Sequence, residues 1–283
     1  MAGDQSATEP PRSGHQSEAL PMIDDGDEPR RRWAPYVAAA LLGVAFVAVW
    51  EYIVSSGRVH AIVLPAPSAV AKSLGSLTTQ GFLYGHLFAT VKAALFGFVI
   101  GSALGFALGI ALGVSEFTRR ALSPYIVVFF TLPKVALAPI FVTWFGFGIS
   151  SKIVMSAVIC FFPVFVDTLS GLWLVDDRSL TLLRSLKASR GQILRKLSLP
   201  TALPNIFAGL KTGITLALVG VVVGEFVGTR QGIGYLIELY SFQLQIADVF
   251  TLILLLGLIG WALYATVDFI DRRVVFWREG RIG

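Results

Sequence analysis

Three ionisable residues lie inside long apolar stretches of this sequence: Lys134, Asp167 and Glu225. A charged side chain at the centre of a membrane helix costs roughly 2.5 to 3.5 kcal/mol on insertion scales, so such residues face water, a polar partner or a transported solute. We expect the positively charged ammonium of Lys134 to attract an anionic solute. We therefore predict that these three residues border a translocation path. Pairing inside a helix bundle is the alternative for each, and Glu225 could instead brace its own helix.

Other reactive groups show no catalytic or metal-binding spacing. The single cysteine, Cys160, lies in an apolar run, and the three histidines share no ligand pattern, so we expect neither a disulfide framework nor a metal site. No His-Glu-x-x-His or Gly-x-Ser-x-Gly motif occurs, which disfavours an intramembrane enzyme. The Gly-x-x-x-x-Gly-Lys-Ser/Thr phosphate loop is also missing, so we expect no enzyme activity and no cofactor in this chain.

A basic segment, residues 175–203, interrupts the apolar sequence. It is too charged for hydrocarbon, because it contains six cations: Arg178, Arg184, Lys187, Arg190, Arg195 and Lys196. Its apolar residues nevertheless keep helical spacing, and they fall within about 100° of a helical wheel. These are Leu183, Leu186, Ile193, Leu194 and Leu197. The segment is therefore predicted to be amphipathic and structured.

Capping signals divide this segment into two short helices. Asp176 and Asp177 can cap the first helix, and Ser189 with Gln192 fits a capping box for the second. We expect a turn at residues 187–189, a bend allowed by Gly191, and an end at Leu199-Pro200. Such an element is predicted to dock a soluble partner, and an interfacial helix on anionic lipid is the alternative.

The elements that position these residues are membrane spans. The chain of 283 residues is 55% hydrophobic and 14% charged, whereas a soluble domain has about 25% charged residues. The class is therefore an all-α polytopic membrane protein. We expect six transmembrane helices at about residues 34–54, 87–114, 122–146, 150–174, 204–228 and 247–269.

The third expected span carries Pro124, Pro133 and Pro139. Each proline removes a helix donor, and irregular backbone at membrane depth is tolerated only beside protein or water. We therefore predict a broken helix near Lys134 that faces protein or a cavity rather than lipid.

Charge distribution indicates the orientation in the membrane. With both termini cytoplasmic, sixteen cations lie inside and four outside, namely Arg58, Lys72, Lys152 and Arg230. This bias also explains the net charge of +5 without nucleic acid binding. We expect a disordered cytoplasmic tail at 1–32, a transmembrane domain at 33–270 that contains the 175–203 coupling segment, and a cytoplasmic tail at 271–283.

Glycines recur every fourth residue in the second expected span. A step of four places them on one slowly turning stripe, which lets another helix approach closely. The stripe consists of Gly97, Gly101, Gly105, Gly109 and Gly113. The partner helix could belong to this chain or to a second copy.

The basic segment resembles the EAA loop of permease subunits in binding-protein-dependent ATP-binding-cassette importers. Aligned on Leu199-Pro200, Leu197 stands at the loop's Ile, Lys187 at its Gly, and residues 181–183 at its Glu-Ala-Ala. Residues 131–148, the Val-Gly-Glu-Phe-Val-Gly run at 223–228 and residues 64–68 are similar to the nitrate, sulfonate and taurine branch. The resemblance covers about residues 34–270.

The resemblance implies a type I importer permease in a bacterial plasma membrane. Two copies would form the pore, two cytoplasmic ATPase subunits would bind ATP and Mg, and an extracytoplasmic binding protein would deliver a small, anionic solute. The implied ATPase-docking residues are Leu183, Leu186, Lys187, Ala188, Ser189, Arg190, Leu197, Leu199 and Pro200. A stand-alone secondary transporter or channel is the alternative, although the halves show no internal repeat.

Overall fold

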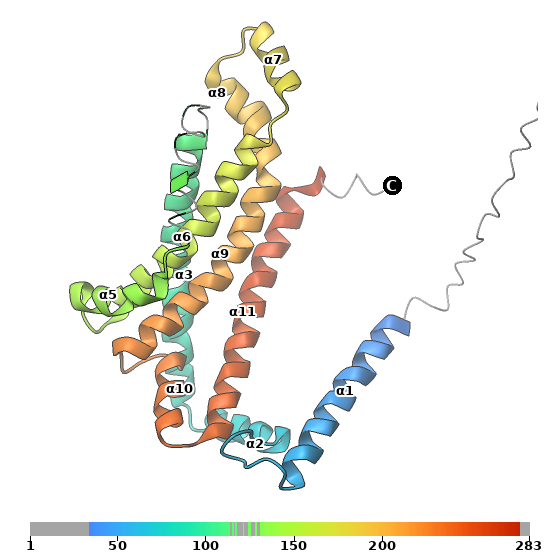
Figure 1. The fold of residues 1–283 in the computed structure, drawn as a ribbon, viewed down its shortest axis with the longest axis vertical. Coiled ribbons are helices and arrows are strands. Elements are labelled where there is room, and N and C mark those ends of the chain that lie inside the picture. Colours follow the sequence, from blue (N-terminus) through green and yellow to red (C-terminus); the bar gives the residue numbers. More distant parts are fainter. Residues whose placement is uncertain are drawn as a thin grey trace, which may run out of the picture. The chain divides into compact units, whose positions relative to one another are not determined.

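A computed structural model describes residues 34–277, except for 114, 116, 118–120, 122–123, 126–127 and 129–130. The described residues form helices and no β-strand (Figure 1). The predicted tail at 1–32, the cations Arg119 and Arg120, and most of the region before Thr131 in the third expected span lie outside the described residues, as do residues 278–283.

The helices follow one another along the chain with short connections. Their bounds are α1 (Ala34–Ser55), α2 (Pro67–Thr79), α3 (Phe82–Gly113), the 3-10 helix η2 (Lys134–Leu137), α5 (Ala138–Phe145), α6 (Ile149–Trp173), α7 (Asp177–Ser185), α8 (Arg190–Ile193), the π-helix η3 (Leu194–Ser198), α9 (Leu199–Gly228), α10 (Ile233–Phe242) and α11 (Ile246–Val274). The chain divides into two compact units, residues 1–48 and 49–283. Every contact described below lies within the second unit.

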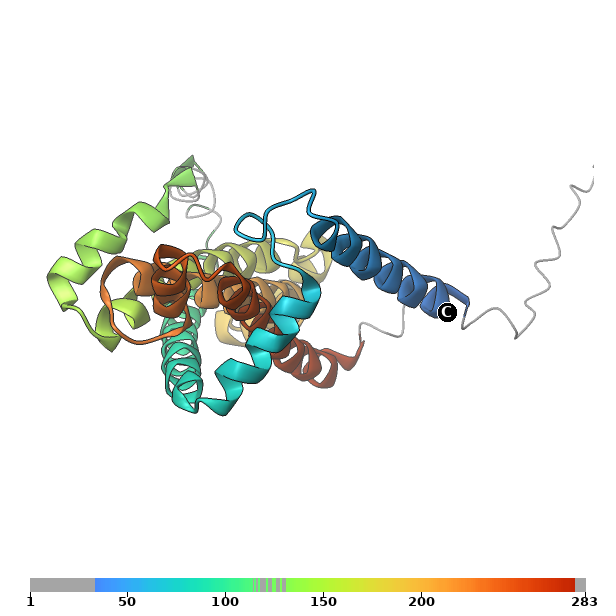
Figure 2. The same ribbon diagram turned by 90° about the horizontal axis from the view of Figure 1, so that it is seen from below.

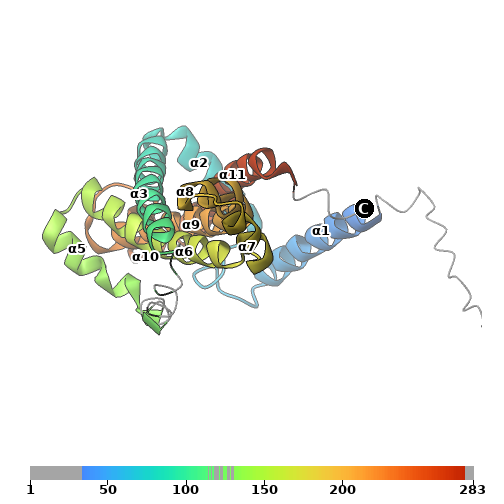
Figure 3. The same ribbon diagram turned by 90° about the horizontal axis from the view of Figure 1, so that it is seen from above.

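Three long helices, α3, α6 and α9, form the centre of this second unit. Helix α6 packs along both α3 and α9, and a fourth long helix, α11, packs on α9 (Figure 3). Seen from the opposite end, the amphipathic α2 lies across the bundle, where it contacts α11 and α3 (Figure 2). The short α10 contacts α9, α11 and α3 at this same end.

The glycine stripe of α3 lies against α6 of the same chain. A Cβ atom at Gly105 would lie 2.8 Å from the carbonyl oxygen of Phe161, and one at Gly109 would lie 2.7 Å from Thr168. Gly97, Gly101 and Gly113 likewise face α6 residues. Because glycine has no side chain, the two helix backbones approach closely along the whole stripe.

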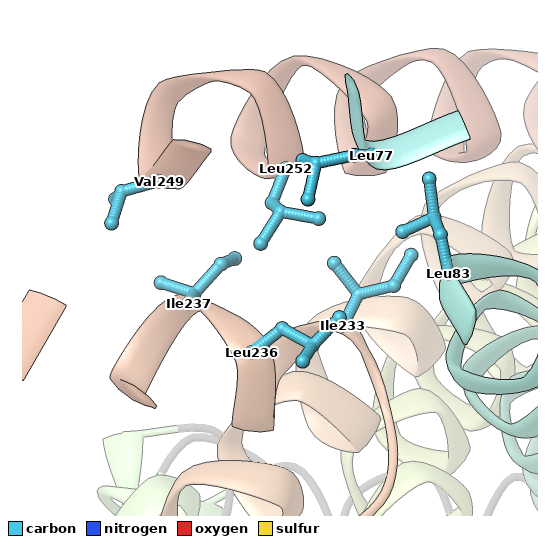
Figure 4. Close-up of a cluster of buried hydrophobic side chains, with 7 residues drawn as sticks. All are labelled: Leu77, Leu83, Ile233, Leu236, Ile237, Val249 and Leu252. Atoms are coloured by element: carbon cyan, nitrogen blue, oxygen red, sulfur yellow. The ribbon is translucent and has the colours of Figure 1, made fainter. Parts of the chain in front are cut away.

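An apolar cluster joins four helices at the α10 end of the bundle (Figure 4). Its buried members come from α2, α3, α10 and α11: Leu77, Leu83, Ile233, Leu236, Ile237, Val249 and Leu252. Hydroxyl groups supplement it, because Ser73 donates to Asp248 over 2.5 Å and Thr251 donates to Ser73 over 2.9 Å. The short helices α2 and α10 are thereby attached to the long α11.

Five helices among the described residues are long and apolar enough to cross a membrane. They are Pro35–Ser55, Phe82–Gly113, Ile149–Trp173, Arg190–Gly228 and Ile246–Val274. The second begins before the predicted 87, and the last ends beyond the predicted 269, within the expected C-terminal tail. The described part of the third expected span contains only the shorter apolar helix Lys134–Phe145, so the count of six spans stays a prediction.

The break predicted near Lys134 is present. Leu132 and Pro133 are not helical, and the chain restarts in the 3-10 helix η2 before α5. One boundary prediction is wrong: Leu199-Pro200 does not end the basic segment. The helix continues from Arg190 through η3 into α9, because Pro200 sits in the first turn of α9 and the π-helical hydrogen bonding just before it accommodates the missing donor.

Candidate functional site

The basic segment folds as a helical hairpin, α7 and α8, at one end of the bundle (Figure 1). Asp176 caps α7 by accepting from the Ser179 amide over 3.2 Å. Ser189 and Gln192 form the predicted capping box at the start of α8. These local hydrogen bonds define both ends of the turn.

The turn between the two helices is a Schellman motif. The Ala188 amide donates to the Leu183 carbonyl over 3.0 Å, and the Lys187 amide donates to Arg184 over 2.9 Å. Lys187 closes the motif with a φ of 55°. Glycine is the residue that adopts this left-handed conformation at least cost, so the geometry explains why the EAA pattern has glycine at this place. The bend is therefore at Lys187 and not at Gly191.

The tip of the hairpin is apolar and basic. Leu182 and Leu186 are 62% and 69% exposed, and all six cations of the segment are exposed. Among the predicted docking residues, Ser189 is also exposed, whereas Leu183 and Ala188 are half-buried. An exposed leucine pair surrounded by cations matches a soluble partner surface with an apolar pocket and carboxylates around it.

The base of the hairpin belongs to the bundle. Leu197, Leu199 and Pro200 are half-buried, and Leu199 packs against the cluster of Leu172, Ala202 and Ile206. The predicted docking residues therefore form two groups, one at the exposed tip and one that joins the hairpin to α9.

Lys134 and Asp167 are both half-buried, on different helices. The Lys134 ammonium lies 4.5 Å from the centre of the Phe162 ring of α6, a cation–π contact. Asp167 packs against α9 at Gly209, where a Cβ would lie 2.8 Å from the Asp167 Cβ. Contact of either residue with a solute stays a prediction.

Glu225 lies apart from both, in a fully buried polar network. Its Oε1 is 3.5 Å from the Lys152 ammonium, and these side chains are 0% and 4% exposed. Oε1 also accepts from Thr90 over 2.9 Å, and Oε2 accepts from the Gly234 amide over 2.8 Å. These contacts favour the bracing role for Glu225.

Lys152 is placed differently from the prediction. The charge count placed it outside the membrane, but it is buried in α6, where Glu225 neutralises its charge.

A second polar cluster was missed by sequence reasoning. The Lys211 ammonium of α9 lies 2.5 Å from Asp268 and 2.6 Å from Asp271 of α11, and Arg272 pairs with Asp268 over 2.9 Å. A lysine in one apolar run and two aspartates at the end of another were the available signal, but only the tertiary structure pairs them. Among the described residues, no group of His, Cys, Asp and Glu could hold a metal ion.

Several long apolar helices, joined by buried ion pairs, define the class as a multi-pass membrane protein. The family model for "Binding-protein-dependent transport system inner membrane component" matches residues 97–277. The chain belongs to this family of importer permeases.

Individual relatives agree with this assignment. SsuC of Bacillus subtilis, whose name assigns it provisionally to aliphatic sulfonates transport, is 34% identical over 256 residues, which is 90% of this chain and 93% of the relative. The riboflavin transport system permease protein RibX of Chloroflexus aurantiacus is 38% identical over 81% of this chain and 85% of its own. The expected importer permease of the nitrate, sulfonate and taurine branch is confirmed for the sulfonate and taurine part of that branch, as is the expectation that the chain is a permease subunit and not itself an enzyme.

Solved structures show the same fold. A chain of the MetNI methionine transporter, in an inward-facing conformation, superposes with a TM-score of 0.60 at 21% identity and covers 68% of this chain and 95% of its own. The type I importer permease fold is therefore confirmed, and the protein is a multi-pass protein of a bacterial membrane.

Proposed function

We propose that this chain is the pore-forming subunit of an ATP-driven importer and that the α7–α8 hairpin docks a separate ATPase. The observation that carries the proposal is the exposed tip, where Leu182, Leu186 and Lys187 project from a hairpin that continues directly into the long α9. A motion of the docked ATPase would reach the membrane through this continuous helix.

The proposed assembly contains two copies of the permease, two ATPases and an extracytoplasmic binding protein. ATP and Mg bind to the ATPases. Both termini and the hairpin lie in the cytoplasm, which agrees with the excess of cations at the hairpin end and in the last turn of α11. The end of the bundle that carries α2 and α10 then faces outward.

The proposed solute is a small anion such as a sulfonate. Support comes from the name of the Bacillus subtilis relative and from Lys134, a half-buried cation on the short η2 helix. The relative named for riboflavin transport makes ring-containing solutes the competing class. Uptake assays therefore include both sulfonates and ring-containing solutes.

The decisive experiment removes the apolar character of the hairpin tip. The double variant Leu186→Asp/Ala188→Asp is expected to insert normally but to lose co-purification with the ATPase and ATP-driven uptake. Phe242→Asp is the matched control, because Phe242 is an equally apolar side chain, 81% exposed, at the opposite end of the bundle.

Normal co-purification of the ATPase with the double variant would refute the docking proposal. Loss of co-purification with Phe242→Asp as well would attribute the effect to general misfolding. Uptake that needs no ATP would instead support a secondary transporter.

A further inference from the structure

The Glu225 network surrounds the start of α10. Three consecutive backbone amides there are satisfied by side chains from other helices. Gly232 donates to His86 over 3.0 Å, Ile233 to Thr90 over 2.9 Å, and Gly234 to Glu225 over 2.8 Å. The first amides of a helix have no partner within the helix, so α3 and α9 together cap α10.

The fit around this cap leaves little room. Gly232 has a φ of 122°, and the Glu225 carboxylate fills the space in which a Cβ at Gly232 would lie. The Lys152 ammonium also donates to the Gln231 carbonyl in the same turn. A buried carboxylate beside a helix N-terminus is stabilised by the helix dipole as well as by the lysine.

Glu225 lies on the same continuous helix as the docking hairpin. The span Arg190–Gly228 has 39 residues, and at about 1.5 Å per residue the distance along the helix from Arg190 to Glu225 is about 50 Å. A displacement of the hairpin therefore has a direct route to the start of α10. No other side chain of α9 accepts from an α10 amide among the hydrogen bonds of the described residues.

We propose that Glu225 is a positioning residue that couples α9 to α10, so that ATP-driven movement of the hairpin also moves the outer end of the permease. Lys152 serves as its counter-ion. The inference rests on the proposed function, since it requires that an ATPase moves the hairpin. The property that matters is the hydrogen-bond acceptor at position 225, because the Gly234 amide needs an acceptor whether or not a charge is present.

Two double variants separate the acceptor from the charge. Both contain Lys152→Met, which avoids an unpaired buried ammonium. Glu225→Gln/Lys152→Met retains an amide oxygen for the Gly234 amide, whereas Glu225→Met/Lys152→Met has a side chain of similar length and no such acceptor. The permease is reconstituted with its ATPase and binding protein in proteoliposomes, and the solute imported per ATP hydrolysed is measured.

The glutamine variant is expected to keep this ratio within about threefold of the native protein. The methionine variant is expected to lose about tenfold or more while it still binds the ATPase and hydrolyses ATP, in the range of known coupling effects between sites. Equal ratios in the two double variants, or loss of ATPase binding in the methionine variant alone, would overturn the proposal.

A second measurement needs no ATPase. Spin labels at Val227 of α9 and Ser241 of α10, in full-length permease in nanodiscs, report the distance between the two helices; the native Cys160 is buried. We expect a narrow distance distribution in the glutamine variant and a broad one in the methionine variant, and equally narrow distributions would overturn the coupling role. The two claims can fail separately. If the spin-label distances behave as expected in both variants but the native permease shows no ATP-driven import, the proposed function is refuted and the connection between α9 and α10 is still supported.

Discussion

At the scale of single residues, Lys187 shows how the hairpin departs from its family pattern. Its φ of 55° is the left-handed conformation, which costs a non-glycine residue about 1 to 2 kcal/mol. Lysine tolerates this conformation better than a β-branched residue. A lysine at this position therefore lowers the stability of the turn relative to glycine. Its exposed ammonium would offset that cost if it contacts an acidic partner.

Substitutions at this position measure that cost. Lys187→Gly and Lys187→Val both remove the charge, but valine is strained at positive φ. We expect the valine variant to weaken the turn by about 1 to 2 kcal/mol relative to the glycine variant. Hydrogen exchange of the Ala188 amide, which donates to Leu183, reports the opening of the turn. Indistinguishable exchange in the two variants would contradict the assigned conformation.

At the scale of helices, the α3–α6 contact determines how the bundle is built. The stripe of glycines lets two backbones approach, and α9 likewise presents Gly209, Gly213 and Gly220 to α6. Helix α6 therefore makes close backbone contacts with both α3 and α9. In lipid, where apolar burial does not drive association, such close packing supplies much of the stability.

A pair of glycine variants in α3 tests this contact. Gly105→Ala would place a Cβ 2.8 Å from the Phe161 carbonyl oxygen, so the helices must separate, at a cost of about 1 to 3 kcal/mol. Gly85→Ala in the same helix meets nothing within 4 Å, and we expect it to be neutral or to stabilise by up to about 1 kcal/mol. Thermal unfolding in detergent compares the two, and a Gly105→Ala variant as stable as Gly85→Ala would argue against this packing.

At the scale of the whole molecule, polar groups occupy distinct levels of the bundle. Lys211 pairs with Asp268 and Asp271 between α9 and α11, and Glu225 pairs with Lys152 near the α10 end. Lys134 is half-buried on the short η2 helix, with its ammonium against the Phe162 ring. We expect this half-buried cation to attract an anionic solute.

Uptake assays of the whole transporter test this role of Lys134. Lys134→Ala is expected to reduce uptake of a sulfonate about fivefold at limiting concentration, equivalent to about 1 kcal/mol, without a change in expression. Lys134→Arg retains the charge and should retain most uptake. Unchanged kinetics in the alanine variant, or equal loss in the arginine variant, would count against electrostatic attraction of the solute.

Much of this molecule follows from short stretches of sequence. Apolar runs predicted the long helices, and Asp176, Ser189 and Gln192 predicted the caps of the hairpin. Pro133 predicted the helix break. These features depend on hydropathy and on hydrogen bonds between neighbours in the chain, so they can be recognised without knowledge of the fold.

Other features were decided only by the tertiary structure. The sequence contained the glycine stripe, Lys152, Glu225 and Lys211, but not their partners: α6, the Lys152–Glu225 pair, and Asp268 with Asp271. Each of these contacts joins residues far apart along the chain. A buried charge needs a counter-ion, and a glycine stripe needs a second helix packed closely against it. The sequence by itself thus determined which residues needed partners, and the packing of the helices decided which partners they have.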